Sequence, residues 1–347
     1  MSLQILVGDC REVLKGMAEG SVQCVVTSPP YWNQRNYFGG EKEIGKETSP
    51  ELYVAKLVEV FREVHRVLKD DGVLFLNLGD SYCSTDPGTL GDPLRQSGIL
   101  LGVRDEAAAV RRKVRPQTPS GLKPKDLIGI PWRVAFALQA EGWYLRSEIT
   151  WLKRAPMPES VHDRPTSATE KIFLLSKSPK YYYNADAVRQ PPSEAFATDR
   201  RWKTGSTERN EKLGYAEAGA QNPKRVHRMF DKKARGHERH RGSDPFLDDT
   251  SRDHQMVNGG NMRNYWLLSP ENFSGEHFAT FPSEIPRRCI LAGCPVGGTV
   301  LDPFLGSGVT AMVALELGRS AIGIELNPSY VELSKQRCNV TPGLALD

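Results

Sequence analysis

The chain has 347 residues, 39% of them hydrophobic, which allows one large α/β domain with a sizeable core and a smaller second domain. Its net charge of +4 identifies no partner, and its six cysteines form no CxxC pair, which argues against a zinc site and predicts reduced thiols. No apolar run approaches the length of a membrane span and no signal peptide is apparent, so we expect a cytoplasmic protein without a membrane anchor.

A short strand at residues 3–9 opens the chain, and a helix is predicted over residues 11–17. Asp9 stands at the junction, where its carboxylate could cap the helix by accepting a hydrogen bond from a backbone N–H. A position just past a strand end is also where open α/β sheets contact their ligands. Both interpretations of Asp9 remain open from the residues alone.

The next strand, residues 22–26, is followed by the sequence Ser28-Pro29-Pro30-Tyr31. Its β-branched residues indicate a buried parallel strand, and the two prolines hold the turn after it rigid. The turn offers a hydroxyl group, carbonyl oxygens without competing N–H groups, and one aromatic ring. Those groups suit a planar substrate that carries an amino group, at an edge of the sheet where ligands bind. A Pro-Pro turn with an aromatic plug is the structural alternative.

An amphipathic helix is predicted over residues 50–69, after a polar loop at residues 33–48 that has no clear period. The apolar side of this helix is expected to carry Leu52, Leu57, Val60, Phe61, Val64 and Leu68. A strand at residues 73–78 follows, and Asp80 comes just after it. Asp80 could therefore bind a ligand or orient the loop.

Two basic segments interrupt the regular pattern. Residues 83–122 are rich in Gly and Pro and carry an arginine cluster, which indicates a flexible insertion. Between residues 200 and 241 there are 13 Lys or Arg against 5 Asp or Glu, interleaved with Trp202, Tyr215 and Phe230. Such a segment is typical of nucleic-acid binding, and a disordered, solvated loop is the alternative. Between the two segments we expect a helix and two strands, at residues 126–140, 145–151 and 170–176.

Residues 299–310 predict a strand, a glycine-rich turn and the start of a helix, and a second strand at residues 320–324 ends at Glu325. Glu325 lies 23 positions after Asp302, close to the separation between a glycine turn and a ribose-binding carboxylate. The glycine spacing is not GxGxxG, and no Lys follows as in a P-loop. The pattern therefore favours a ligand that contains adenosine but no phosphates.

Together, the Ser-Pro-Pro-Tyr motif and the later Asp-Pro-Phe-Leu-Gly-Ser-Gly motif at residues 302–308 resemble the DNA amino-methyltransferases of the β arrangement. In that family the catalytic motif precedes the S-adenosylmethionine motif, and the target-recognition region lies between them. The resemblance implies methyl transfer from S-adenosylmethionine to an exocyclic amino nitrogen of double-stranded DNA, with S-adenosylhomocysteine as product and no metal. His277–Ser283 resembles the family's further cofactor motif, in which Phe281 packs near the methionine part.

The motifs, the basic segment and the resemblance together assign roles to three groups of residues. The expected catalytic residues are Ser28, Pro29, Pro30 and Tyr31. The expected cofactor contacts are Asp9, Cys10, Phe281, Asp302, Pro303, Phe304, Gly306, Ser307, Gly308, Thr310, Glu325 and Asn327. The expected DNA contacts are Trp32, Arg35, Tyr37, Arg200, Arg201, Lys203, Lys224, Arg225 and Arg228, although the first three could instead anchor their loop.

The implied mechanism begins with a base flipped out of the duplex into the pocket at the catalytic turn. Oxygen atoms of Ser28 and Pro29 accept the amino protons, and the nitrogen displaces the sulfonium methyl group directly. Within the resembling family, Ser before Pro-Pro-Tyr favours N4 of cytosine, while Asp is more frequent in N6-adenine enzymes, so adenine is the alternative. A cytosine-carbon methylase would need an activated Cys after a proline, whereas Cys294-Pro295 has the opposite order. A non-catalytic DNA-binding protein with this fold is the alternative from another class, and a nicotinamide-dependent oxidoreductase is a weaker one.

The expected fold is α/β, a Rossmann-like methyltransferase with a doubly wound mixed sheet, helices on both faces, a hairpin-like pair of strands and a basic target-recognition insertion. The expected parts are a first catalytic section, a basic flexible insertion, a second catalytic section, a target-recognition region and a cofactor-binding section, at residues 1–82, 83–122, 123–189, 190–264 and 265–347. Duplex DNA is the expected partner of a monomer or homodimer, and a cognate restriction endonuclease acting on the same site is a candidate partner.

Overall fold

The computed structural model describes residues 1–33, 42–83, 121–190, 260–271 and 281–339. The chain divides into two compact units, one of Met1–Ala187 with Arg263–Asp347 and one of Val188–Met262. In the second unit, Gln190 and Gly260 exchange two backbone hydrogen bonds of 2.9 and 2.8 Å. The proposed insertion and recognition region lie almost wholly outside the described residues, so the five-part division of the chain stays a prediction.

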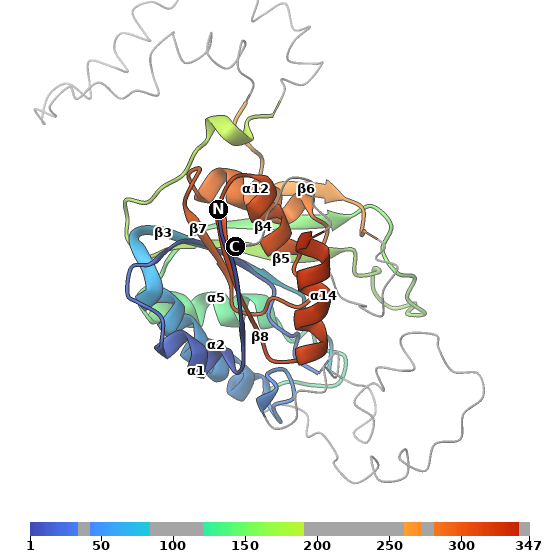
Figure 1. The fold of residues 1–347 in the computed structure, drawn as a ribbon. Helices are drawn as coiled ribbons and strands as arrows, with labels where there is room; N and C mark the ends of the chain where they lie inside the picture. The colour runs from blue at the N-terminus through green and yellow to red at the C-terminus, as the bar shows by residue number, and fades with distance from the viewer. Residues whose placement is uncertain (34–41, 84–120, 191–259, 272–280, 340–347) are drawn as a thin grey trace, which may run out of the picture. The chain divides into compact units, whose positions relative to one another are not determined.

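An eight-stranded sheet organises the first unit (Figure 1). Its order is β1-β8-β7-β2-β3-β5-β4-β6, and neighbouring strands are parallel except where β5 pairs with β3 and β4. The strands are β1 (Leu3–Val7), β2 (Val22–Thr27), β3 (Leu68–Leu78), β4 (Tyr144–Lys153), β5 (Thr169–Ser176), β6 (Tyr265–Leu268), β7 (Thr299–Asp302) and β8 (Ser320–Glu325). Because β5 is the reversed strand among these eight, its first residues lie at the edge where the other strands end.

Helices cover both faces of the sheet, as Figure 1 shows. One group packs together as α1 (Cys10–Lys15), α2 (Pro50–Val67) and α5 (Ile130–Ala140), and the other as α12 (Glu284–Gly293), α13 (Val309–Glu316) and α14 (Pro328–Asn339). A short 3-10 helix, η3, spans Asp186–Val188. The doubly wound α/β fold expected from the sequence is confirmed, with β5 antiparallel to both β3 and β4, and with β6 outside β4.

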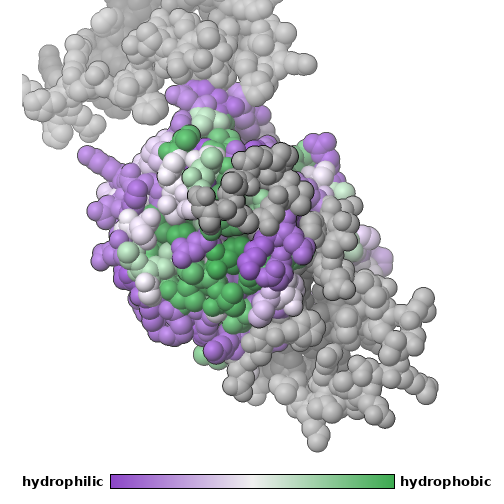
Figure 2. Space-filling view, viewed as in Figure 1, coloured by the Kyte–Doolittle hydropathy of each residue, from purple (hydrophilic) through white to green (hydrophobic). Residues whose placement is uncertain are grey.

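The centre of the sheet is apolar on both faces, as the β-branched pattern of the second strand predicts. Every residue of β2 is buried, and Cys24 within it has no exposed surface. All six cysteines are free and buried, so they act as small core residues. β1 forms one edge of the sheet, with Val7 56% exposed, and hydrophobic residues gather in the middle of the face that Figure 2 shows. None of the described helices is long and apolar enough to cross a bilayer.

Helix α2 forms where the amphipathic pattern predicts it, with two corrections to its apolar face. Ser49 caps the helix by accepting the Leu52 N–H at 3.3 Å, and a proline follows at the first helical position. Leu57 has no exposed surface, whereas Leu52 is 53% exposed. Residues that are five positions apart differ in direction by about 140° around the helix axis, so Leu52 points away from the face that holds Leu57. Leu68 is buried, but it begins β3 instead of ending the helix.

Three further elements differ from the expectation. The helix expected from residue 126 begins at Ile130, because Gly129 at its N-cap has φ +77° and Asp80 accepts the N–H groups of Gly129 and Ile130. Of the two roles considered for Asp80, ligand binding and orientation of the loop, the structure shows the second. β6 and α14 were not anticipated, since β6 has four residues and α14 starts directly after the tip of the cofactor strand.

The corrected face of α2 gives a test of the core. Replacing Leu57 by Ala leaves a cavity against the sheet and is expected to lower the free energy of unfolding by about 2–5 kcal/mol. Leu52→Ala on the same helix removes an exposed side chain and is expected to change it by less than about 0.5 kcal/mol. Urea unfolding of both variants provides the measurement, and equal losses would contradict the orientation of α2.

Candidate active site

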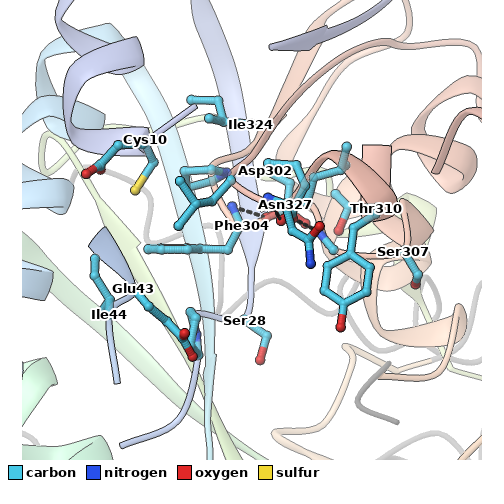
Figure 3. A pocket seen from close by; sticks show the side chains of 18 of the residues that line it. Cys10, Ser28, Glu43, Ile44, Asp302, Phe304, Ser307, Thr310, Ile324 and Asn327 are labelled. Atoms are coloured by element: carbon cyan, nitrogen blue, oxygen red, sulfur yellow. Dashed lines mark hydrogen bonds between the residues drawn. The ribbon is translucent and has the colours of Figure 1, made fainter. Parts of the chain in front are cut away.

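The site lies where four neighbouring parallel strands end. β1, β8, β7 and β2 are adjacent in the sheet, so the segments that follow them lie side by side at its carboxyl edge. A cavity of about 120 Å³ opens there and receives residues from all four strand ends. Figure 3 shows the side chains of Ser28, Phe304 and Asn327 arranged around this common space.

Most of the residues proposed from the sequence line this cavity. The proposed cofactor contacts found there are Asp9, Cys10, Phe281, Asp302, Pro303, Phe304, Gly306, Ser307, Thr310, Glu325 and Asn327. Two of the four proposed catalytic residues, Ser28 and Pro30, line it as well. Pro29, Tyr31 and Gly308 do not line it, although each belongs to a segment that does. The structure thus brings the two sequence motifs to one cavity, while the role of each residue stays a prediction.

The glycine-rich turn needs glycine for two separate reasons. Gly306 and Gly308 adopt φ values of +54° and +82°, which side chains rarely adopt. A Cβ on Gly308 would also lie 2.7 Å from the Cβ of Ser334 on α14. From the same helix, Arg337 donates to Ser307 Oγ at 2.6 Å. Gly308 therefore shapes the cavity by letting α14 approach the turn.

Glu325 ties the glycine-rich turn to the end of β8. Its Oε2 accepts the Gly306 N–H and its Oε1 accepts the Asn327 N–H, each at 2.8 Å. Burial raises the pKa of this carboxyl above its usual value, against the opposing effect of the two amides. Each carboxylate oxygen has a further lone pair, so these bonds leave the group able to accept from ribose hydroxyls.

Asp302, at the end of β7, is 3% exposed and joins the two motifs. Its Oδ1 accepts from the Thr27 hydroxyl at 2.6 Å and from the Phe304 N–H at 3.0 Å. Thr27 directly precedes Ser28, and Phe304 belongs to the glycine-rich turn. Burial raises the pKa of the Asp302 carboxyl to about 6, although these hydrogen bonds favour the ionised form.

For Asp9 the structure confirms the helix cap, and contact with a ligand stays a prediction. Its side chain caps α1 by accepting the Arg11 N–H at 3.0 Å, and it also lines the cavity. Partial burial opposes ionisation, but the Arg11 guanidinium at 2.6 Å holds the pKa of Asp9 below its usual value. Burial raises the pKa of the Cys10 thiol to about 12, so Cys10 is a neutral lining residue and no nucleophile.

The Pro-Pro turn is held by contacts from α2, from β5 and from Gly79. Tyr53 of α2 donates its hydroxyl to the Pro30 carbonyl at 2.8 Å. The Tyr31 ring lies against Gly79, where an added Cβ would come within 2.5 Å of ring atom Cε2. The Tyr31 hydroxyl donates to Glu170 at 2.5 Å and lies 3.3 Å from Ser28 Oγ. These contacts hold Pro30 and Tyr31 in place, and Ser28 lines the cavity.

The DNA contacts proposed from the sequence receive one correction. Trp32 is 4% exposed, and its indole N–H donates to the Glu47 carbonyl at 2.9 Å. It is therefore a buried anchor, the alternative noted for this loop, and its side chain does not face solvent. The other proposed contacts, Arg35, Tyr37, Arg200, Arg201, Lys203, Lys224, Arg225 and Arg228, lie outside the described residues.

Sequence reasoning missed several residues of the cavity wall. These include Lys42, Glu43 and Ile44 after the catalytic turn and Tyr330 on α14. Residues 42–44 follow a loop without period, so no sequence signal marked them. The Asn327-Pro328 pair was a usable signal for Tyr330, because proline suits the first turn of a helix. Within the described ranges, no group of three His, Cys, Asp or Glu residues could hold a metal ion.

Comparisons with known proteins agree on one family. A family model described as DNA methylase, of the N6/N4 type, matches residues 22–336. The Type II methyltransferase M.SmaI of Serratia marcescens is 42% identical over 97% of this chain and 90% of its own length. M.Cfr9I of Citrobacter freundii, also a Type II methyltransferase, is 40% identical over 95% of this chain and 85% of its own length.

Two solved structures share the fold. The PvuII DNA methyltransferase, described as cytosine-N4-specific, has a TM-score of 0.58 and 17% identity, covering 99% of this chain and 89% of its own. A putative DNA modification methylase from Thermus thermophilus, complexed with S-adenosyl-L-methionine, has a TM-score of 0.53 and 22% identity, covering 100% of this chain and 99% of its own.

The buried Asp302 carboxyl gives a pH-dependent test of the site. Its pKa is about 6 when folded against 3.8 for the free group, so the folded protein holds this proton more tightly. Stability from this group is therefore full below about pH 4 and is lost as the pH rises through about 6. The Asn side chain of Asp302→Asn cannot ionise and so avoids this loss. The free energy of unfolding of the variant should therefore rise relative to that of the wild type between about pH 4 and pH 6. A difference between the two proteins that stays constant across this range, measured by urea unfolding, would contradict the buried carboxyl.

Proposed function

The chain belongs to the N6/N4 family of DNA methylases and is an S-adenosylmethionine-dependent enzyme, and we propose that it methylates the N4 amino group of cytosine in duplex DNA. The observation that carries the choice of cytosine is Ser28, whose side chain lies at the cavity between the two motifs. In the resembling family, Ser at this position of the Pro-Pro-Tyr motif favours cytosine. Adenine N6 is the alternative target, since the same oxygen atoms would accept its amino protons.

The target base has to leave the duplex, because its amino group cannot reach the cavity while it is stacked. The lone pair of that nitrogen is delocalised into the ring, so the free amino group is a poor nucleophile. We assign Ser28 Oγ and the Pro29 carbonyl as acceptors of the amino protons, which draws the nitrogen toward tetrahedral geometry. We assign no such role to the Pro30 carbonyl oxygen, because it already accepts a hydrogen bond from the Tyr53 hydroxyl.

S-adenosylmethionine supplies the electrophilic methyl group on its sulfonium. Of this chain's residues, Glu325 would accept from the ribose hydroxyls, and Asp9 with Cys10 would border the adenine. Phe281 would pack against the methionine part, and the glycine-rich turn lets the backbone approach the ligand closely. Holding both reactants in line supplies most of the rate enhancement in such a site, together with the fixed oxygen acceptors.

Duplex DNA is the proposed partner, with the basic segment between residues 200 and 241 as the main contact to its backbone. The relatives M.SmaI and M.Cfr9I are Type II methyltransferases, which supports a place in a restriction–modification system with a cognate endonuclease. We propose a cytoplasmic, DNA-associated location on the same ground.

Identification of the product tests the choice of base. Purified protein is incubated with radiolabelled S-adenosylmethionine and unmethylated genomic DNA, and the nucleosides of the product are separated. Label in N4-methylcytosine is the expected result. Label in N6-methyladenine would retain the mechanism and refute the choice of base, while a protein that binds the cofactor but transfers no label would support the non-catalytic alternative.

Ser28→Ala tests the proposed acceptor. Loss of this oxygen should lower kcat by about 10²-fold, the scale seen when one polar group facing the reacting atoms is removed. The affinity for S-adenosylmethionine should change by less than about twofold, because the cofactor contacts remain. Ser21→Ala at the opposite end of β2 is the matched control, since Ser21 donates to the Ala18 carbonyl on the surface. A Ser28→Ala variant with wild-type kcat would refute the role.

A further inference from the structure

A carboxylate outside the cavity reaches the catalytic turn from β5. Since β5 runs against its neighbours, its start lies beside the end of β3, with Lys171 opposite Leu78 and Ile172 opposite Asn77. Side chains alternate along a strand, so Glu170 and Asn77 share one face of the sheet. That face is the one on which the Tyr31 hydroxyl lies.

Glu170 is bound from three sides. Its Oε2 accepts from Tyr31 Oη at 2.5 Å and from Asn77 Nδ2 at 2.9 Å. Its Oε1 lies 2.5 Å from Lys153 Nζ at the end of β4. The side chains of Glu170 and Lys153 are 11% and 26% exposed, so this ion pair borders solvent.

The partners of Glu170 fix the direction of every hydrogen bond in the cluster. A carboxylate only accepts, and Asn77 turns its NH₂ toward Tyr31 and Glu170, so the Tyr31 proton points at Glu170. The Tyr31 oxygen then accepts from Ser28 Oγ at 3.3 Å. Asn77 Nδ2 also donates to Ser28 Oγ, at 3.4 Å. Because the Ser28 proton points away from the cavity, Ser28 Oγ keeps a further lone pair that can accept from a substrate amino group.

We propose that Ser28, Tyr31 and Glu170 form a proton relay that carries the proton of the methylated amino group from the cavity to Glu170. This inference rests on the proposed amino-methyl transfer. The nitrogen forms a bond to the methyl carbon, and the C–S bond breaks with its electron pair going to sulfur. The nitrogen gives one proton to Ser28 Oγ, the Ser28 proton passes to Tyr31 Oη, and the Tyr31 proton passes to Glu170 Oε2. Neutral Glu170 then releases the proton to solvent beside Lys153.

A structural role for Glu170 makes a different prediction, because it would only hold the Tyr31 ring in place. The titratable groups that the structure places against Glu170 are Lys153 on β4 and Tyr31 after β2. Without the carboxylate, a relay has to lose its proton to bases in solution, and the reaction should speed up as the pH rises. A ring that is merely displaced would not recover in this way.

The experiment compares Glu170→Gln, Tyr31→Phe and the double variant with the wild type. Single-turnover methyl transfer from labelled S-adenosylmethionine to unmethylated genomic DNA is measured between about pH 7 and pH 9, with cofactor affinity measured separately. Glu148→Gln is the matched control, because Glu148 pairs with Lys171 at 2.5 Å on the same two strands, with side chains 23% and 29% exposed. Tyr31→Phe keeps the ring, so it tests the relay even if loss of Glu170 harms folding.

For a relay, each single variant should slow transfer by about 10²-fold, the low end for proton transfer by a positioned group. The double variant should be no slower than the slower single variant, since either change interrupts the same path. The cofactor affinity of each variant should stay within about twofold of that of the wild type. The ratio of the wild-type rate to the Glu170→Gln rate should fall as the pH rises to about 9.

Three results would overturn the relay while leaving the methyltransferase assignment intact. They are a Glu170→Gln variant as fast as Glu148→Gln, losses that multiply in the double variant, and a ratio of rates that is independent of pH. A wild-type protein that transfers no methyl group to DNA would instead overturn the proposed function and the relay together.

Discussion

The hydrogen bond between Thr27 and Asp302 joins the two halves of the site. The two residues are 275 positions apart, and their side-chain oxygens lie 2.6 Å apart at the ends of β2 and β7. Asp302 also accepts from the Phe304 N–H, so one carboxylate holds the strand that leads into the catalytic turn and the glycine-rich turn together. Its burial raises its pKa to about 6, so the ionised form of Asp302 is disfavoured in the folded protein.

Much of this arrangement was predictable from local sequence. Ser28 and Asp302 both follow short apolar strands, and the carboxyl ends of neighbouring parallel strands meet at one edge of a sheet. Gly308 was marked by its glycine-rich context, although the reason it needs glycine, the approach of Ser334, lies in a helix that the sequence reading missed. The family assignment depended on the order of two short motifs, and that order is a property of the sequence itself.

The remaining features depend on pairings that no local pattern encodes. Glu170 reaches Tyr31 only because β5 is reversed and pairs with β3 in one register. Trp32 follows the catalytic motif directly, yet its indole turns inward to the Glu47 carbonyl, which was not distinguishable from an exposed aromatic in a polar loop. Leu52 fitted a helical period but fell outside its buried arc. In each case the tertiary partner decided the outcome, and the partner was distant in the sequence.

The alternation of side chains along β5 has a consequence for insertions and deletions. Glu170 pairs with Lys153 on one face of the sheet, and the next residue, Lys171, pairs with Glu148 on the other. A shift of β5 by one residue against β3 would exchange the faces and bring an ammonium group, which can only donate, to the Tyr31 hydroxyl. The loop before β5 can vary in length without this effect, whereas the strand itself cannot. The register of β5 thus matters to the site as much as the presence of a carboxylate at Glu170.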